Sequence, residues 1–438
     1  MRTPILSCTL MVTILGGCGD DGGSKVPPRI IEGGGISDGP IDGVANIYVI
    51  NDLTREPVAG AKVLVGTLEG ETDATGLFIV EDVKGPQTIA VKAATFRSEM
   101  WVGANGANMT FDLEAATKPV APRATLTGSI DTSSIIVPQG HLRFGLVFYS
   151  QTDDLGDPSN EIATPNDKNV CSGGGMNNPQ PCTFTIDVRP GRIALLAAIY
   201  DRDLKGTPTM FDDDTMTLIR WAYRGGITVT AGVAQNGQDL TLVDVGNMGN
   251  LTVDFGSPPS GLSTVGALIG MNLGIDGVFQ MPLFRTPTDA TLLTPKLAAF
   301  TGATSYRLTA IASNGTDPAT TQSIVIRRVL TGPTLAAGTW LTPPASPTIT
   351  RTGAKWTPIA GATVHSVEYK QGTASVLNIT AFDSSTEVTI PELVALPAGT
   401  LTGTLSGIGA EGLDVMDFAL DVDEDKLNAV SAQTATIN

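Results

Sequence analysis

The sequence predicts an all-β chain of tandem antiparallel β-sandwich domains that follow an N-terminal targeting segment and a flexible tether. Short runs of alternating apolar and polar residues recur along the chain, with turn residues between them. The composition agrees, because 50 glycines and 28 prolines accompany only 5% aromatic residues. A chain of 438 residues is too long for one small sandwich and indicates three or four domains.

The N-terminus has the pattern of an export signal. Arg2 supplies the positive charge, and the apolar run that follows is too short to cross about 30 Å of hydrocarbon as a helix. The next stretch, Leu15-Gly16-Gly17-Cys18, resembles the lipobox of bacterial lipoproteins. This resemblance implies that residues 1–17 are a signal peptide and that Cys18 carries a diacylglyceryl group. An ordinary secretory signal with an incidental cysteine is the alternative.

Residues 18–43 form the predicted tether, which begins with the polar stretch Gly19-Asp20-Asp21-Gly22-Gly23-Ser24. Beyond it no stretch approaches 18 apolar residues, so the lipid on Cys18 is the only membrane contact that we expect. A single acyl chain holds a protein weakly, but a lipidated cysteine can bear more than one. We therefore expect an extracytoplasmic, lipid-anchored protein of the cell envelope, with the outer membrane favoured over the inner.

Turn motifs define the first predicted domain, residues 44–115. They are Pro57-Val58-Ala59-Gly60-Ala61, then Thr72-Asp73-Ala74-Thr75-Gly76-Leu77-Phe78, then Gly85-Pro86-Gln87-Thr88-Ile89. Asp73 can accept bonds from the following backbone in an Asx turn, and Gly76 can take a positive φ. These motifs resemble those of the carboxypeptidase regulatory-like, or transthyretin-like, domain. That resemblance implies a non-catalytic accessory β-sandwich.

Prolines mark the predicted domain boundaries in the remainder of the chain. A linker over residues 116–123 precedes a second predicted β-sandwich over residues 124–255, whose strand order loosely echoes the first; a diverged repeat is one interpretation. Its run from Ile193 to Tyr200 predicts a buried strand.

A third β-domain is predicted over residues 256–343, with a short helix from about Asp289 to Phe300. The last domain, residues 348–438, resembles a fibronectin type III-like sandwich, in which a buried Trp (Trp356) precedes a strand that ends in Tyr (Tyr369).

The four cysteines sort by position. Cys8 leaves with the signal and Cys18 is the lipidation site, so Cys171 and Cys182 remain as a pair around a loop with no core of its own. In an exported protein this spacing predicts a disulfide that closes a surface loop. A metal site is the alternative, and the lack of a nearby histidine disfavours it.

No catalytic motif emerges from the sequence. The only histidines, His141 and His365, fall in different predicted domains, which disfavours a histidine-based triad or a multi-histidine zinc site. The chain contains neither a Gly-x-Ser-x-Gly elbow nor a phosphate-binding Gly-x-x-x-x-Gly-Lys loop. We therefore predict no catalytic residues.

Two acidic clusters are candidates for a cation. Close carboxylates repel each other, and a hard ion such as Ca²⁺ relieves that repulsion. The C-terminal cluster fails the EF-hand pattern, because Lys426 and Ala432 occupy its glycine and final acidic positions. A non-EF-hand Ca²⁺ site is therefore a hypothesis for the other cluster, and solvated acidic loops are the competing one. The clusters are Asp201, Asp203, Asp212, Asp213 and Asp214, and Asp417, Asp421, Asp423, Glu424 and Asp425.

The sequence as a whole predicts a non-catalytic binding or structural module. The net charge of −17 argues against nucleic acid, because phosphate contacts need clustered Lys and Arg. The expected partners are the membrane, through the lipid alone, and an unidentified envelope or extracellular protein or polysaccharide. The alternative is an extracytoplasmic hydrolase of envelope or extracellular polymers, whose carboxylates converge in the fold. A concave pocket with two opposed carboxylates would favour the hydrolase.

Overall fold

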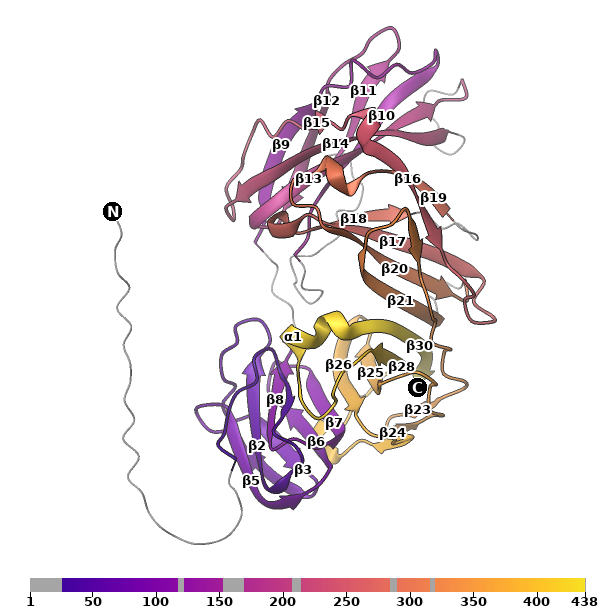
Figure 1. Ribbon diagram of the computed structural model, residues 1–438. Helices are drawn as coiled ribbons and strands as arrows, with labels where there is room; N and C mark the ends of the chain where they lie inside the picture. Colours follow the sequence, from indigo (N-terminus) through magenta and orange to yellow (C-terminus); the bar gives the residue numbers. More distant parts are fainter. Residues whose placement is uncertain are drawn as a thin grey trace, which may run out of the picture.

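The computed structural model describes residues 26–116, 122–152, 169–206, 214–283, 290–315 and 320–437. This part of the chain is mostly β-strand and folds into several sheets, which confirms the predicted fold class (Figure 1). A short α-helix, α1 (Leu420–Asp423), lies near the end of the chain. Within the described residues no helix is long and apolar enough to cross a membrane. The predicted signal peptide and Cys18 lie outside these residues. We group the strands into four units in chain order.

The first unit contains the turns that the sequence predicted, but it begins before residue 44, because Ile36 and Ile41 of the predicted tether are buried in its core. Asp73 Oδ1 accepts hydrogen bonds from the backbone N–H of Thr75 (2.8 Å) and Leu77 (3.1 Å), and Gly76 has a φ of 74°. A side chain at Gly76 would also place its Cβ 2.6 Å from the carbonyl oxygen of Val49. The strands of the unit are β1 (Gly35–Ser37), β2 (Asp42–Asn51), β3 (Lys62–Val65), β4 (Leu68–Glu71), β5 (Leu77–Lys84), β6 (Gln87–Lys92), β7 (Ser98–Ala104) and β8 (Asn108–Leu113).

The second unit repeats the strand order of the first. The order β4-β3-β6-β7 in the first corresponds to β11-β10-β13-β14 in the second, and the pair β2-β5 corresponds to β9-β12. In the first unit, strand β8 runs parallel to β2. In the second unit, parallel bridges at Leu126–Gln235 and Ile130–Leu240 bring the segment after β14 back along β9, which corresponds to β2. The strands are β9 (Ala124–Ile130), β10 (His141–Tyr149), β11 (Val170–Gly175), β12 (Cys182–Val188), β13 (Gly191–Asp203), β14 (Thr215–Val229) and β15 (Thr241–Leu242).

The third unit contains no α-helix where one was predicted. In place of the helix from Asp289 to Phe300, β19 (Ala290–Pro295) pairs with its neighbour β16 and a 3-10 turn, Leu297–Ala299, follows. That prediction was wrong because pairing with β16 determines the extended conformation of this segment, and such a partner is not local in the sequence. The other strands are β16 (Met248–Asp254), β17 (Thr264–Asn272), β18 (Val278–Leu283), β20 (Ser305–Ser313), β21 (Thr321–Leu330) and β22 (Thr334–Ala336).

The fourth unit has the same two-sheet plan as the third. A four-stranded row, β26-β25-β28-β30, faces the three-stranded sheet β23-β24-β27; the third unit has β18-β17-β20-β21 and β19-β16-β22. The buried core between the sheets contains Trp356 and Tyr369, as the sequence indicated. The strands are β23 (Thr348–Thr350), β24 (Gly353–Lys355), β25 (Val364–Gln371), β26 (Ala374–Ala381), β27 (Glu387–Thr389), β28 (Leu401–Ala410), β29 (Phe418–Ala419) and β30 (Leu427–Ile437).

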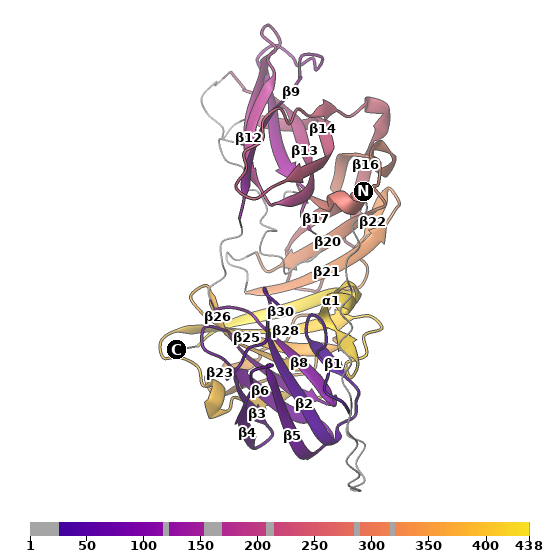
Figure 2. The ribbon, with the colours of Figure 1, turned by 90° about the vertical axis from the view of Figure 1, so that its left-hand side faces the viewer.

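One twelve-stranded sheet joins the third, fourth and first units, and its order differs from the order of the chain. Strand β21 of the third unit pairs with β30 of the fourth, and β26 of the fourth pairs with β7 of the first. The chain therefore folds back, so that its first and last units lie side by side, while the second and third lie together at the other end (Figures 1 and 2).

Strand β13 is buried on both faces, which explains its unbroken apolar sequence. Leu195 and Ala197 pack into the core of the second unit, whereas Leu196 and Ala198 pack against apolar residues of the third. An antiparallel strand with one face in solvent would alternate with polar residues. The predicted buried strand from Ile193 to Tyr200 is thus confirmed, and its second covered face is the contact with the third unit.

Candidate ligand-binding cleft

Strands of the first and fourth units pair with each other at two seams. From the fourth unit, β29 adds to the edge of the first unit's sheet, where Gly35 and Ile36 of β1 pair with Ala419 and Phe418. In the other direction, β7 of the first unit pairs in parallel with β26, from Ser98–Leu377 to Val102–Ala381. The two seams hold residues 279 to 384 positions apart in the sequence in fixed register, because a one-residue slip would turn every side chain to the wrong face.

Aromatic rings fill the space between the seams. Trp101 stacks on Phe111 at a centroid distance of 3.9 Å, and its edge meets Phe382 of the fourth unit at 5.5 Å. Phe382 in turn lies 5.6 Å from Phe418. Large buried aromatic surfaces of this kind contribute strongly to an interface. The column therefore fixes the two units against each other.

A cleft of about 670 Å³ opens beside this column. Trp101, Phe382 and Phe418 form part of its wall, and the exposed side chains of Leu53 and Leu420 stand at its rim. Seven acidic residues and two arginines also line it. The volume lies within the usual range of small-molecule sites, which runs from roughly 300 to 1,000 Å³. The acidic residues are Asp52, Glu99, Asp112, Glu114, Asp421, Asp423 and Glu424.

Arg55 lies at the centre of the first group of carboxylates. Its guanidinium approaches Asp112 Oδ2 at 2.5 Å, Asp421 Oδ1 at 3.0 Å and Asp52 Oδ1 at 3.9 Å. Asp52 and Asp112 belong to the first unit and Asp421 belongs to α1, so the arginine links the two units. One positive charge is thus shared by three carboxylates.

Arg97 organises the second group. It donates to Glu99 Oε1 at 2.8 Å and to Glu114 Oε2 at 2.5 Å. Glu99 is only 6% exposed, and burial raises the pKa of its carboxyl even though Arg97 acts in the opposite direction. Two carboxylates share this arginine, so the cleft as a whole carries an excess of negative charge.

Asp112 also has a strongly perturbed carboxyl. Burial, followed by the charge of Asp52, raises its pKa to about 7, although Arg55 opposes the shift. Its Oδ1 is buried and has no hydrogen-bond donor among the described residues. Asp52 lies within hydrogen-bonding contact of Asp112, and two carboxyl groups can make such a bond only when one of them is protonated. At neutral pH this pair therefore needs a proton or another cation.

This geometry suits cation binding better than glycoside hydrolysis. The paired carboxyls of glycosidases stand at least about 5 Å apart, so that the sugar or a water fits between them. Asp52 and Asp112 lie within hydrogen-bonding contact, and Arg97 pairs with both Glu99 and Glu114. The cleft offers negative charge and an apolar wall rather than an opposed acid and base.

The described residues of the cluster predicted near residue 200, Asp201, Asp203 and Asp214, do not line this cleft. His141 Nδ1 lies 2.8 Å from Asp201 Oδ1, and Lys205 pairs with Asp203. The side chain of Asp214 is almost completely buried and pairs with Arg202. Asp212 and Asp213 lie outside the described residues, and among the residues that are described no three His, Cys, Asp or Glu side chains are placed to hold a metal ion. A Ca²⁺ site in this loop stays a prediction.

The C-terminal acidic cluster does contribute, although its partners were missed. Asp421, Asp423 and Glu424 line the cleft. The residues from Met109 to Glu114 alternate between apolar and polar, a pattern typical of a strand with one face in solvent. The fourth unit covers that face instead. In the sequence, Asp112 is distinguished only by its position next to Phe111 in an alternating strand. That pattern does not show that the fourth unit covers the side chain of Asp112.

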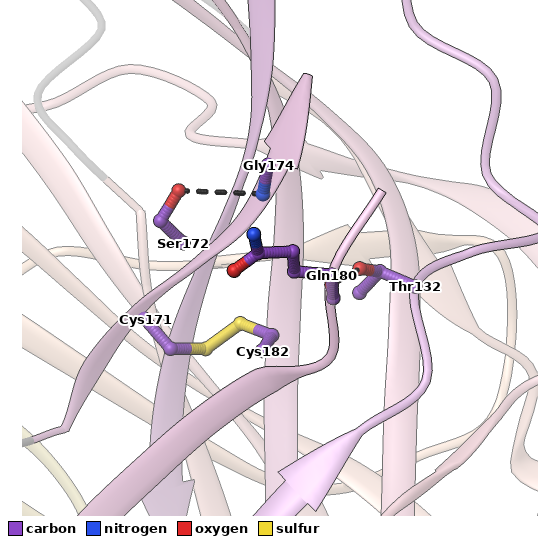
Figure 3. The surroundings of a disulfide bond; sticks show 6 residues. All are labelled: Thr132, Cys171, Ser172, Gly174, Gln180 and Cys182. Carbon is purple, nitrogen blue, oxygen red and sulfur yellow. Dashed lines mark hydrogen bonds between the residues drawn. A yellow bond between two sulfur atoms is a disulfide. The ribbon is translucent and has the colours of Figure 1, made fainter. Parts of the chain in front are cut away.

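The predicted disulfide is present and its position is informative. Cys171 of β11 bonds Cys182 of β12, with the two Cα atoms 5.2 Å apart (Figure 3). These strands belong to different sheets, and both cysteines are buried, so the bond joins the sheets across the core while the loop between them stays exposed. Gly145 lies against it, because a Cβ there would come within 2.9 Å of both sulfurs.

The histidines lie in strands of different units. His365 of β25 is buried beside Trp356, and its Nε2 accepts a hydrogen bond from the backbone N–H of Ile359 at 3.1 Å. Burial lowers the pKa of its imidazole, which keeps the ring neutral as this bond requires. Its role in the structure is therefore to satisfy a buried backbone group.

Comparisons with known proteins return only distant matches. No family model matches the chain, and no curated protein matches its sequence. Among solved structures it is similar to the Bacillus anthracis TIE protein (10% identity, 67% of this chain and 49% of that chain, TM-score 0.15). It therefore spans about half the length of that protein.

Two further matches are the shaft pilin SpaA of Lactobacillus rhamnosus GG (8% identity, 46% and 97% of the two chains, TM-score 0.14) and a Ca²⁺-stabilised ice-binding adhesin of an Antarctic bacterium (10%, 92% and 100%, TM-score 0.14). TM-scores this low do not establish a common fold.

Proposed function

We propose that this chain is a lipid-anchored, extracytoplasmic module of tandem β-sandwiches that binds a ligand or partner and catalyses no reaction. The cleft between the first and fourth units carries this proposal. Units far apart in the sequence pair their strands there, and the resulting cleft is lined by both carboxylates and aromatic rings. A site held by two strand seams and an aromatic column is pre-organised, and pre-organisation lowers the entropic cost of binding.

The location outside the cytoplasm is supported independently of the cleft. The stretch Leu15-Gly16-Gly17-Cys18 supplies the anchor in this account. The buried Cys171–Cys182 bond fits an oxidising compartment, because structural disulfides are rare in the cytosol.

In this proposal the first unit is a carboxypeptidase regulatory-like accessory domain. The Asx turn at Asp73 and the positive φ of Gly76 support it. The fourth unit is fibronectin type III-like, and its sheets of three and four strands around Trp356 and Tyr369 support that. Both resemblances indicate recognition or scaffolding.

One observation favours a carboxylate-based hydrolase as the alternative. Asp112 lies in a cleft and its carboxyl titrates near pH 7, as the general acid of an enzyme often does. Its contact with Asp52 and its ion pair with Arg55 argue instead for a charge network that binds a cation.

Incubation of the purified full-length protein with isolated polysaccharide and protein fractions of the cell envelope separates the two functions. A binding module is retained on a fraction without releasing fragments, and Asp112→Asn behaves like the wild type in the fragment assay. Release of soluble fragments by the wild type, lost in Asp112→Asn, would contradict the proposal and establish the hydrolase.

A further inference from the structure

We infer that the ligand of the cleft is an organic cation, an ammonium or guanidinium group carried on an apolar body. This inference rests on the proposed function and deepens it, because it names the ligand class for the same site. The ligand's charge would meet the carboxylates around Arg55 and Arg97, and its apolar part would lie against the aromatic wall.

The charges of the cleft give the first reason. Arg55 and Arg97 together face five carboxylates within their two groups, so these side chains alone carry a formal excess of three negative charges when all are ionised. Asp423 and Glu424 add to it at the edge of the cleft, and Lys426 balances Asp423. Like charges at short range in a partly desolvated site repel strongly, and a bound cation relieves that repulsion.

Hydrogen bonding gives the second reason. The buried Oδ1 of Asp112 has no donor among the described residues, and its neighbour Asp52 is itself a carboxylate. A buried acceptor without a donor costs free energy, and bonds from a charged N–H group to a carboxylate are among the strongest in proteins. Because Oδ1 itself is shielded from solvent, an ammonium or guanidinium in the cleft would stabilise this pair through its charge and through bonds to the half-exposed carboxylate of Asp52.

The wall of the cleft gives the third reason and excludes a bare point charge as the best fit. Trp101, Phe382 and Phe418 line the cleft, although Trp101 and Phe418 are largely buried, and Leu53 and Leu420 add exposed apolar surface. Aromatic rings attract organic cations through their π faces. Apolar surface next to carboxylates therefore matches an amphipathic cation better than a fully hydrated ion.

Isothermal titration calorimetry on the full-length protein in detergent tests this inference. The probes are phenethylamine and agmatine, and the uncharged comparison is 2-phenylethanol. We expect one site per chain for an amine probe, weaker binding at higher salt because the attraction is electrostatic, and no measurable binding of the alcohol. No binding of either amine at about 10 mM, or equal binding of the alcohol, overturns the inference.

Variants locate the site. Asp52→Asn with Asp421→Asn removes two partly exposed carboxylates of the cleft and should weaken amine binding at least about 10-fold. The matched control, Glu69→Gln with Glu71→Gln, removes the same charge from exposed positions on β4 and should leave the affinity unchanged. Equal affinities in the two double variants would overturn the inference.

One more variant keeps the inference testable if the Asp52→Asn, Asp421→Asn double variant does not fold. Leu53→Lys changes an exposed rim residue and places an ammonium group of the protein beside the carboxylates, so it should abolish amine binding while the thermal midpoint stays unchanged. Full amine binding by Leu53→Lys overturns the inference.

Titration with CaCl₂ distinguishes a metal site. Binding of Ca²⁺ in the cleft without binding of either amine overturns the inference. The proposed function fails separately, if the protein cleaves envelope polymers or if Cys18 does not anchor it.

Discussion

Ser323 of the third unit faces Ser431 of the fourth directly across the seam between β21 and β30, and neither residue is exposed to solvent. Ser323 Oγ donates to the carbonyl of Leu341 at 2.8 Å, and Ser431 Oγ donates to the carbonyl of Thr342 at 3.2 Å. The chain segment between the two units is thereby bound over the seam that joins their sheets. The paired serines thus hold both the linker and the junction.

Removal of these hydroxyl groups should destabilise the junction. Ser323→Ala leaves the buried Leu341 carbonyl without its donor, so we expect a loss of about 1–3 kcal/mol in the free energy of unfolding. Urea denaturation measures it. The control is Ser375→Ala, because the buried Ser375 Oγ has no hydrogen-bond partner among the described residues and its loss should be close to neutral. Equal effects of the two substitutions would count against the assigned role of Ser323.

The turn of the first unit gives a second prediction. Gly76→Val should cost roughly 1–3 kcal/mol, because it combines a positive φ with a backbone clash. Gly85→Val carries the positive φ alone, with open space around it, and should cost less. Gly246→Ala has neither feature and serves as the neutral control. Melting profiles that do not follow this order would mean that the turn is wrongly placed.

The titration of Asp112 predicts how stability depends on pH. Its pKa is about 7 in the folded chain and near 3.8 in the unfolded chain, so between these values the folded state binds the extra proton. The stability that this group contributes is complete below about pH 4 and is lost as the pH rises through 7. Wild type should therefore lose more stability between pH 5 and 8 than Asp112→Asn does.

Urea denaturation at the two pH values checks this prediction. Asp42→Asn, which alters a well-exposed carboxylate paired with Lys84, should retain the pH dependence of the wild type. An unchanged pH dependence in Asp112→Asn would mean that Asp112 titrates normally.

The disulfide predicts a redox-dependent stability. Cys171 and Cys182 should resist thiol labelling in the exported protein without reductant, and both should label after reduction and unfolding. Replacement of both by serine should lower the free energy of unfolding by about 3 kcal/mol, because the bond closes a loop and joins two sheets. Quantitative labelling of both cysteines without reductant would refute the bridge.

Local chemistry explains which parts of this structure could be predicted from the sequence. The turn at Asp73 and Gly76 was predictable because its hydrogen bonds reach only a few residues along the chain. The buried strand β13 and the pair Cys171–Cys182 were predictable for similar reasons, since an apolar run and a short cysteine spacing are visible directly.

The contacts that build the cleft were not predictable in this way. Strand pairing between β7 and β26 joins residues almost 280 positions apart, and no local propensity specifies such a partner (Leu377 pairs with Ser98). The sequence around Asp112 alone is typical of the solvent side of a strand, and the C-terminal acidic cluster lies about 300 residues further along the chain. Only the return of the fourth unit to the first brings them around Arg55.

The central claim is that this is an anchored extracytoplasmic protein, and membrane fractionation of two cysteine variants tests it most directly. Cys18→Ser should lose the lipid and move from the membrane fraction, and from the detergent phase of a partition assay, to the soluble fraction. Cys8→Ser alters a cysteine that leaves with the signal peptide, so it should remain membrane-bound like the wild type. Persistent membrane association of Cys18→Ser, or equal release of both variants, would contradict the account.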